Sequence, residues 1–323
     1  MKKAILHSDA ILLTTAIIWG FAFVAQRVGM DHVGPFLFNG IRFALGCLVL
    51  LFFIFIDGNR TAAPVPGAQA APAKTPAGGG ILAGLLLFGG ASFQQVGIVY
   101  TTAGKAGFIT GLYVIIVPFL GLFWRQHTTL GTWMGAILAA VGMYFLSISE
   151  QFTIAYGDFL VLLSAFFFAA HVLVIGWLSP KMNSYRLAFM QYAACSLLSL
   201  IMAAVCEDIQ LVGIIRAAVP ILYGGVMSVG IAYTLQVIGQ KKAHPAHAAI
   251  LLSLESVFAA LGGWVMLNEI MVPRQLAGCT LMLAGMLISQ LWIFIIEPAH
   301  KKGAPSPADT TQCDASPPGD SIG

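Results

Sequence analysis

The sequence predicts an all-α integral membrane protein in which ten transmembrane helices form two inverted five-helix repeats. Of its 323 residues, 59% are hydrophobic and only 9% are charged, and the mean hydropathy is +0.88. A soluble domain carries about 25% charged residues, so lipid must replace water over much of this surface. Two further observations support the prediction: ten long apolar runs and an ordered internal similarity. The composition excludes a cytosolic enzyme, a secreted domain and a disordered chain.

Each apolar run has about the 20 residues that a bilayer-crossing helix needs. The first is interpreted as a retained span because Asp9 interrupts its start and no A-x-A cleavage site follows. A β-barrel is excluded because it would show shorter segments of alternating polarity. Glycines such as Gly131 and Gly135 suit close helix contacts. The predicted spans are 10–28, 35–56, 81–100, 105–124, 130–148, 158–178, 186–206, 218–239, 246–267 and 274–296.

Lys and Arg residues are enriched in cytoplasmic loops of membrane proteins, so their distribution orients the chain. Eleven lie at the termini or in even-numbered loops, and four lie in odd-numbered loops. This count predicts a multi-pass protein of the plasma or inner membrane with both termini in the cytoplasm. The net charge of +3 is too small and too dispersed for a nucleic-acid interface. The Lys and Arg residues assigned to odd-numbered loops are Arg27, Lys105, Arg216 and Arg274, and Arg42 lies inside a span.

Two segments are too polar to cross a membrane. Residues 57–79 are rich in Pro, Ala and Gly, and residues 298–323 form a polar tail. Neither can bury enough apolar surface to fold, so we expect a flexible cytoplasmic loop and a disordered cytoplasmic tail. The predicted organisation is a first repeat over 1–150, a second over 151–297 and the tail over 298–323.

The two halves match each other in order along the chain. Each half has five spans, so the second must enter the membrane from the opposite side. Inverted repeats around a midplane site are typical of secondary transporters. The matches include Asp9 with Asp158, Trp19 with Phe168 and Arg42 with Gln191 at an offset of 149, and Gln95 with Gln236 at an offset of 141.

Arg42 and Glu255 lie well inside predicted spans, where a charged side chain costs about 2.5–3.5 kcal/mol on insertion scales. Arg42 is a candidate contact for a substrate carboxylate; alternatively, it snorkels outward or holds a neighbouring helix. Glu255 is a candidate for carrying a proton during transport or for binding a substrate amine. The alternatives for Glu255 are a hydrogen bond to a serine or a pair with Arg42. Glu269, at the end of the same span, is interpreted as a cap or a packing residue.

Neutral polar and aromatic residues complete the candidate binding site. Amides can line a polar cavity or join helices, and aromatic rings can form cavity walls or pack against other helices and lipid. A mid-span imidazole can titrate near neutral pH, or it can be a buried histidine satisfied by its neighbours. The candidates are Gln94, Gln95, Gln236, Trp19, Tyr113, Phe168 and His171.

The chain shows no pattern for a metal, a cofactor or a catalytic nucleophile. His244 and His247 are three residues apart beside Lys241 and Lys242, which fits a basic helix start better than a metal site. The H-E-x-x-H pattern, the Walker A motif and the nucleophile elbow are absent. The five cysteines are scattered and odd in number, as expected of small buried side chains.

Two stretches resemble a known family, namely YTTAGKAGFITGLYVIIVP (Tyr100 to Pro118) and LLSLESVFAALGGWVMLNE (Leu251 to Glu269). Together with Trp19-Gly20, they are similar to EamA-type transporters of the drug/metabolite transporter superfamily. Ser256 departs from that pattern, which often has a proline after the glutamate. The resemblance covers roughly residues 8–296. It implies export or exchange of small metabolites, amino acids or toxic compounds without ATP.

The leading hypothesis is therefore a secondary active transporter, without enzymatic activity, that exports a small organic metabolite by alternating access. A flippase for a lipid or lipid-linked sugar is the alternative within the same superfamily, and a membrane-embedded enzyme using Glu255 and the histidines is a third hypothesis. The expected partners are a small-molecule substrate and the lipid bilayer. The sequence leaves a homodimer open.

Overall fold

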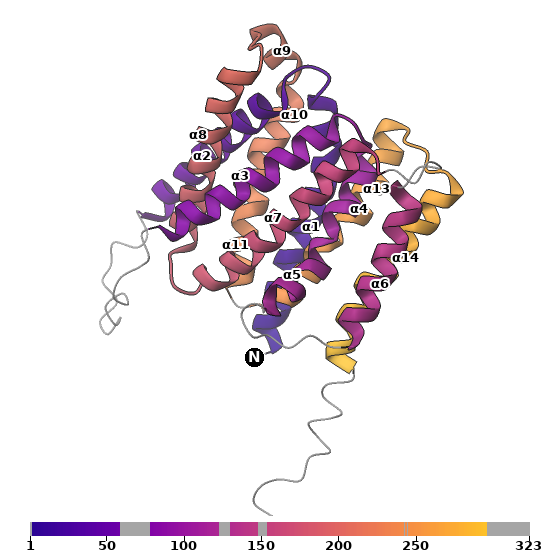
Figure 1. The fold of residues 1–323 in the computed structure, drawn as a ribbon. Coiled ribbons are helices and arrows are strands. Elements are labelled where there is room, and N and C mark those ends of the chain that lie inside the picture. Colours follow the sequence, from indigo (N-terminus) through magenta and orange to yellow (C-terminus); the bar gives the residue numbers. More distant parts are fainter. Residues whose placement is uncertain are drawn as a thin grey trace, which may run out of the picture.

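The computed structural model describes residues 2–58, 78–122, 130–147, 154–241, 243 and 245–295, and it is built from helices (Figure 1). The predicted loop over 57–79, apart from its ends, and the predicted tail over 298–323 lie outside the described residues. Within the described part, the helices run alternately up and down and pack into a bundle.

The helices coincide with the predicted spans to within a few residues, except that the first begins earlier. Eight helical segments are long and apolar enough to cross a membrane, and α6 and α14 occupy the fifth and tenth positions. The chain is thus an all-helical membrane protein. The helices are α1 (Lys2–Gly29), α2 (Pro35–Gly58), α3 (Gly79–Ile98), α4 (Ala103–Gly111), α5 (Tyr113–Gly121), α6 (Leu130–Ser147), α7 (Tyr156–Leu178), α8 (Ser184–Cys206), α9 (Leu211–Arg216), α10 (Ala218–Leu222), η2 (Tyr223–Tyr233), α11 (Thr234–Gln240), α12 (Pro245–Ser253), α13 (Glu255–Leu267) and α14 (Pro273–Ile295).

Contacts between the halves follow the internal similarity. The second spans of the two halves pack together as α2 and α8, and the fifth spans as α6 and α14. The first span, α1, contacts η2 and α11 of the eighth span, and its counterpart α7 contacts α3 of the third. The packing is therefore nearly unchanged when the halves are exchanged, as expected for a duplicated five-helix unit around a central pseudo-symmetry axis.

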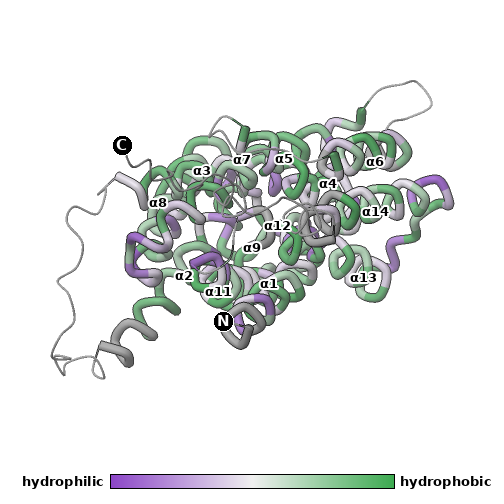
Figure 2. Tube along the Cα trace, turned by 90° about the horizontal axis from the view of Figure 1, so that it is seen from below, coloured by the Kyte–Doolittle hydropathy of each residue, from purple (hydrophilic) through white to green (hydrophobic). Residues whose placement is uncertain are grey.

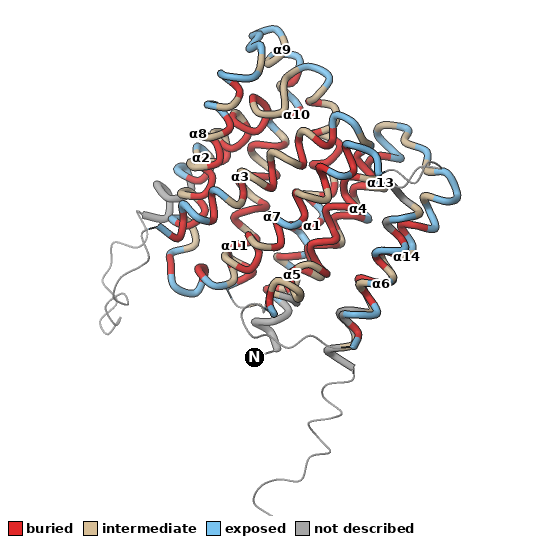
Figure 3. Tube along the Cα trace, viewed as in Figure 1, coloured by how far each residue is buried: buried red, intermediate tan, exposed pale blue. Residues whose placement is uncertain are grey.

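The outside of the bundle is apolar. Hydrophobic residues cover most of the helices in Figure 2, and a hydrophilic stretch marks the turn between α13 and α14. Buried residues line the inside of the bundle in Figure 3, whereas large apolar side chains such as Leu197, Val219 and Trp264 are exposed. Lipid accounts for this arrangement, since water would not tolerate so extensive an apolar surface.

The α6–α14 pair stands at one edge of the bundle (Figure 1). Glycines allow these two helices to approach closely, as predicted. A Cβ atom on Gly142 would collide with the backbone of Gly278, and one on Gly285 would collide with the carbonyl of Gly135. Small residues at such contacts permit the van der Waals packing that associates helices in lipid.

The end of the bundle that lies farther from the N-terminus, at the top of Figure 1, is here called the distal end. Three carboxylates connect the two halves there. Glu207 accepts hydrogen bonds from the backbone N–H groups of Phe36 (2.7 Å) and Leu37 (2.8 Å) at the start of α2. Asp158, in the first turn of α7, forms an ion pair with Lys105 (2.5 Å) and accepts a hydrogen bond from Thr101 Oγ1 (2.6 Å).

Glu269 is the third of these carboxylates. It accepts hydrogen bonds from the backbone N–H groups of Ala103 (2.8 Å) and Gly104 (3.0 Å) at the start of α4. Asn268, at the end of α13, has a left-handed backbone (φ 54°), which asparagine tolerates better than most residues. This turn directs Glu269 back towards α4. The interpretation of Glu269 as a cap is confirmed, although the helix that it caps is α4 rather than its own.

Candidate functional site

A cavity lies in the middle of the bundle, where helices of both halves meet. The space that protein atoms leave empty there is about 460 Å³, but the centres of water molecules can reach only about 30 Å³ of it. That is room for about two waters. The conformation is therefore contracted, and the cavity must widen to hold anything larger.

The cavity brings together most of the residues proposed from the sequence. Seven of the candidate binding residues line it, together with Phe168. Gln95 does not line it; its Nε2 donates to the backbone carbonyl of Gln26 (3.3 Å) and joins α3 to α1. The helix-joining alternative therefore describes Gln95. The seven are Trp19, Arg42, Gln94, Tyr113, His171, Gln236 and Glu255.

Arg42 is a buried cation. The side chain is 2% exposed, and its guanidinium lies over the rings of Phe43 (5.1 Å) and Phe38 (5.6 Å). Such cation–π contacts compensate part of the cost of burial. Among the described residues, Arg42 forms no ion pair, and its Nε has no hydrogen-bond partner. The snorkelling alternative does not fit, because the side chain points into the protein.

Glu255 stands where the ninth span is interrupted. Leu254 separates α12 from α13, and Glu255 is the first residue of α13. Glu255 is 4% exposed and pairs with no Lys or Arg in the described part of the chain. The neighbouring Ser256 donates to the carbonyl of Gly107 (2.9 Å). Neither the pair with Arg42 nor a hydrogen bond from this serine is formed.

The fourth span has a matching interruption. Leu112 separates α4 from α5 and lies 142 positions before Leu254. At the same offset, Tyr113 corresponds to Glu255, and both line the cavity. The Tyr113 hydroxyl has no hydrogen bond of good geometry with any residue that the structure describes. At both points the backbone stays in the right-handed helical region (Leu112 φ −60°, ψ −17°; Leu254 φ −61°, ψ −14°), so each is a local irregularity within one continuous span.

An aromatic wall closes one side of the cavity. The rings of Trp19 and Tyr233 lie 4.5 Å apart, and Trp19 Nε1 donates to the carbonyl of Ser228 (3.2 Å). Ser228 and Tyr233 belong to η2, a stretch of π-helix in the eighth span. Such segments are frequent at functional sites, because they free backbone groups and bring side chains out of the regular register.

Amide and imidazole groups complete the polar lining. His171 Nε2 is hydrogen-bonded to Gln191 Oε1 (2.7 Å), so this histidine is satisfied by a neighbour and still faces the cavity. Gln94 Nε2 donates to Thr110 Oγ1 (3.1 Å). Among the described residues, the Oε1 atoms of Gln26 and Gln236 are buried without a hydrogen-bond partner, so both remain available as acceptors at the cavity.

Sequence reasoning missed several lining residues. Most are apolar or occupy helix positions whose facing requires the fold to be known. One signal was available in the internal similarity of the halves: Thr110 and Leu252 are 142 positions apart, like Tyr113 and Glu255, so one offset relates both pairs. The residues missed are Ala22, Phe23, Gln26, Thr110, Val172, Ser228, Tyr233 and Leu252.

Metal ligands do not gather in the described residues. No three His, Cys, Asp or Glu side chains in that part of the chain are placed to hold an ion. His244 and the side chain of His247 lie outside the residues that the structure describes.

Comparisons with known proteins place the chain among transporters. An archaeal protein from Archaeoglobus fulgidus, described as an uncharacterized transporter, is 34% identical over 88% of this chain and 86% of its own length. The uncharacterized transporter YoaV of Bacillus subtilis is 21% identical over 86% of this chain and 94% of its own. One crystal structure superposes with a TM-score of 0.65 at 17% identity, covering 88% of this chain and 98% of the other, which supports the fold.

The sequence profile of the EamA-like transporter family matches the chain twice, over residues 7–148 and 155–291. The two matches correspond to the two five-helix halves and exclude most of the tail. The match covers most of the chain, and the relatives agree with it. The chain is a membrane transporter that belongs to the EamA-like transporter family.

Proposed function

We propose that the chain is a secondary active transporter that exports a small organic metabolite by alternating access, and that this metabolite carries both an acidic and a basic group. The observation that carries the proposal is that Arg42 and Glu255 are both buried, line one cavity and form no ion pair among the described residues. Arg42 presents a planar guanidinium suited to a carboxylate, and Glu255 presents a carboxylate suited to an amine. The export direction is taken from the family resemblance.

Energetics support a ligand-binding role for these charges. A buried charge without a partner costs several kcal/mol, and apolar side chains of similar size would fill the same space at lower cost. A zwitterion would satisfy both charges at once, whereas water satisfies them only in part. The aromatic wall of Trp19 and Tyr233 would then contact the apolar part of the molecule.

Glu255 also offers a means of coupling substrate export to the movement of protons. A carboxylate that binds a substrate amine in one access state can bind a proton in the other. Because both compete for the same oxygens, occupancy by one excludes the other. That competition would make the exchange of a proton for a cationic group obligatory.

Purified protein in proteoliposomes tests the proposal. With an imposed proton gradient, we expect labelled zwitterions to move faster than matched acids without the amine or amines without the acid. Protein-free liposomes provide the background. Equal fluxes for zwitterions and their one-charge analogues would contradict the proposal. Scrambling of a fluorescent phospholipid in the same vesicles, without zwitterion flux, would favour the flippase alternative.

A further inference from the structure

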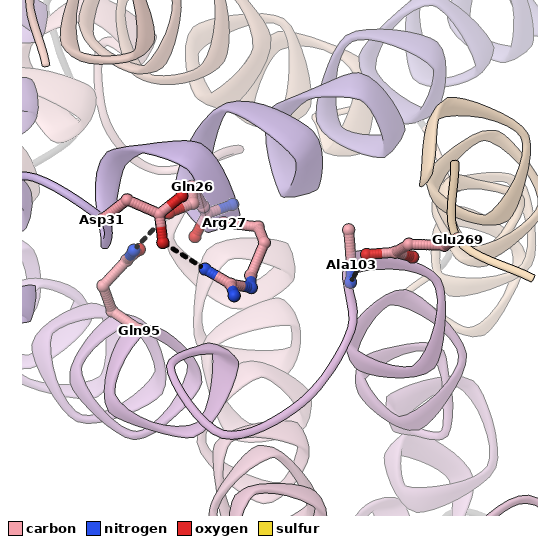
Figure 4. A network of polar contacts seen from close by, with 6 residues as sticks. All are labelled: Gln26, Arg27, Asp31, Gln95, Ala103 and Glu269. Atoms are coloured by element: carbon pink, nitrogen blue, oxygen red, sulfur yellow. Dashed lines mark hydrogen bonds and ion pairs between the residues drawn. The ribbon is translucent and has the colours of Figure 1, made fainter. Parts of the chain in front are cut away.

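A second cavity lies at the distal end of the bundle. The centres of water molecules can reach about 540 Å³ of it. We call this cavity the vestibule; its lining includes Arg27, Val28, Thr101, Thr102, Leu267 and Glu269. Figure 4 shows Arg27 and Asp31 in one group of labelled residues and Ala103 with Glu269 in the other. Arg27 and Asp31 form an ion pair of 2.9 Å.

Three helices lead from the vestibule to the central cavity. On α1, Arg27 of the vestibule follows Gln26 of the cavity. From Thr102, just before α4, to Thr110 of the cavity is about 12 Å at 1.5 Å per residue. On α13, Leu267 lies about 18 Å along the helix from Glu255. The two cavities therefore lie one after the other along the same three helices.

A tight seam separates the two cavities. Helix α13 packs on both α1 and α4. A Cβ atom on Gly107 would overlap that of Ala259, and one on Gly262 would crowd the Val24 side chain of α1. Backbones this close leave no room for a solute between them. On the α4 side the seam consists of small residues and backbone, so α4 and α13 can part there without separating interdigitated large side chains.

Two sets of hydrogen bonds connect α13 and α4 across this seam. Ser256 binds the carbonyl of Gly107 within it, and Glu269 binds the N–H groups of Ala103 and Gly104 at its distal end. Hydrogen bonds to a carboxylate are about twice as strong as neutral ones. The Glu269 contact lies on the wall of the vestibule, where water can replace the amides when the helices part.

We infer that the seam between α13 and the pair α1 and α4 is the gate through which the transported molecule passes between the central cavity and the vestibule, and that Glu269 is the latch that holds it closed. This inference rests on the proposed transport function. It places Glu269 as a positioning residue that controls access without touching the substrate.

Thiol labelling tests the gate without any substrate, so its outcome is independent of the proposed metabolite. The five native cysteines are replaced, and single cysteines are introduced as Ala22→Cys in the central cavity or Val99→Cys in the vestibule. A hydrophilic maleimide is applied to the protein in detergent. We expect fast labelling of Val99→Cys and slow labelling of Ala22→Cys.

Adding Glu269→Gln should speed the labelling of Ala22→Cys about tenfold, since the charge and one good acceptor are lost. Glu207→Gln is the matched control: it weakens an equivalent cap, on α2, that does not line the vestibule. Ser256→Ala provides a second, milder opening of the same seam should Glu269→Gln fail to fold. Unchanged labelling in the seam variants, or an equal increase with Glu207→Gln, would overturn the inference.

Discussion

Charged groups lie at both the distal end and the central cavity, in opposite surroundings. At the distal end, Glu207 and Glu269 each accept two backbone N–H groups, and Asp158 holds Lys105. In the cavity, Arg42 and Glu255 are almost fully buried and form no ion pair among the described residues. The first set has partners within the fold. The second has no ionic partner in that part of the chain, and our proposal takes these two groups as substrate-binding charges.

The largest effect is expected at Arg42. Replacing it with Met keeps the volume and removes the guanidinium, so a carboxylate substrate should bind about 10–100-fold more weakly, for charge-assisted bonds of about 1.5–3 kcal/mol. Arg42→Lys keeps the charge but loses the planar fork, and should bind with intermediate affinity. Equilibrium binding to the purified variants measures both. Unchanged affinity in Arg42→Met would make Arg42 a structural charge.

Glu255→Gln should retain the fold and some substrate binding, because glutamine resembles the protonated acid. Concentrative transport and its dependence on the pH gradient should be lost, since the side chain no longer exchanges a proton. Glu255→Ala should be worse, as the hydrogen-bonding groups around it would lack a partner. Flux in proteoliposomes with and without a pH gradient measures this. Gradient-driven transport at the parent rate in Glu255→Gln would assign coupling elsewhere.

The distal end should show the reverse pattern. Asp158→Leu leaves Lys105 without its partner in a mostly buried position, and breaking such a pair costs up to about 3–5 kcal/mol. The melting temperature in detergent should fall clearly. Adding Lys105→Met should recover much of the loss, because two apolar side chains replace the pair at little cost. A double variant as unstable as the single one would mean that the ion pair is not the source of the stability.

The smallest effect concerns the turn that aims Glu269. Asn268→Val should lower stability by about 1–2 kcal/mol, since a β-branched residue opposes a left-handed backbone. Asn268→Gly should be neutral or slightly stabilising. Thermal unfolding of the two variants side by side measures the difference. Equal melting temperatures would show that the turn relaxes.

The positive-charge count predicts that the distal end faces away from the cytoplasm. Reporter fusions at residues 65 and 310 should both give a cytoplasmic signal. Periplasmic phosphatase activity at either site would contradict the predicted orientation of the distal end.

The spans were predictable because lipid imposes a length and a polarity on each helix, and the helices follow those limits closely. The candidate site was largely predictable for the same reason: residues such as Arg42, Gln94 and Glu255 are costly in lipid, so they must face the interior. Apolar lining residues such as Phe23 and Val172 carry no such penalty, and sequence does not distinguish them from ordinary core. Gln95 shows the converse, a polar residue used to join helices.

Contacts between distant segments were beyond sequence reasoning. Nothing local to Glu207 or Glu269 indicates that each caps a helix of the other half, about 170 residues away. Those contacts depend on how the two repeats pack, which follows from many weak helix–helix contacts acting together. The interruptions at Leu112 and Leu254 are similarly visible only in the folded chain.

Arg42→Met and Glu207→Gln, measured together, test the central distinction most directly. Each variant is assayed for zwitterion flux in proteoliposomes and for its melting temperature in detergent. We expect Arg42→Met to lose flux while its melting temperature stays the same or rises, because a buried charge without a partner has been removed. Glu207→Gln should keep its flux and melt at a lower temperature. A lower melting temperature for Arg42→Met with flux retained would contradict the account.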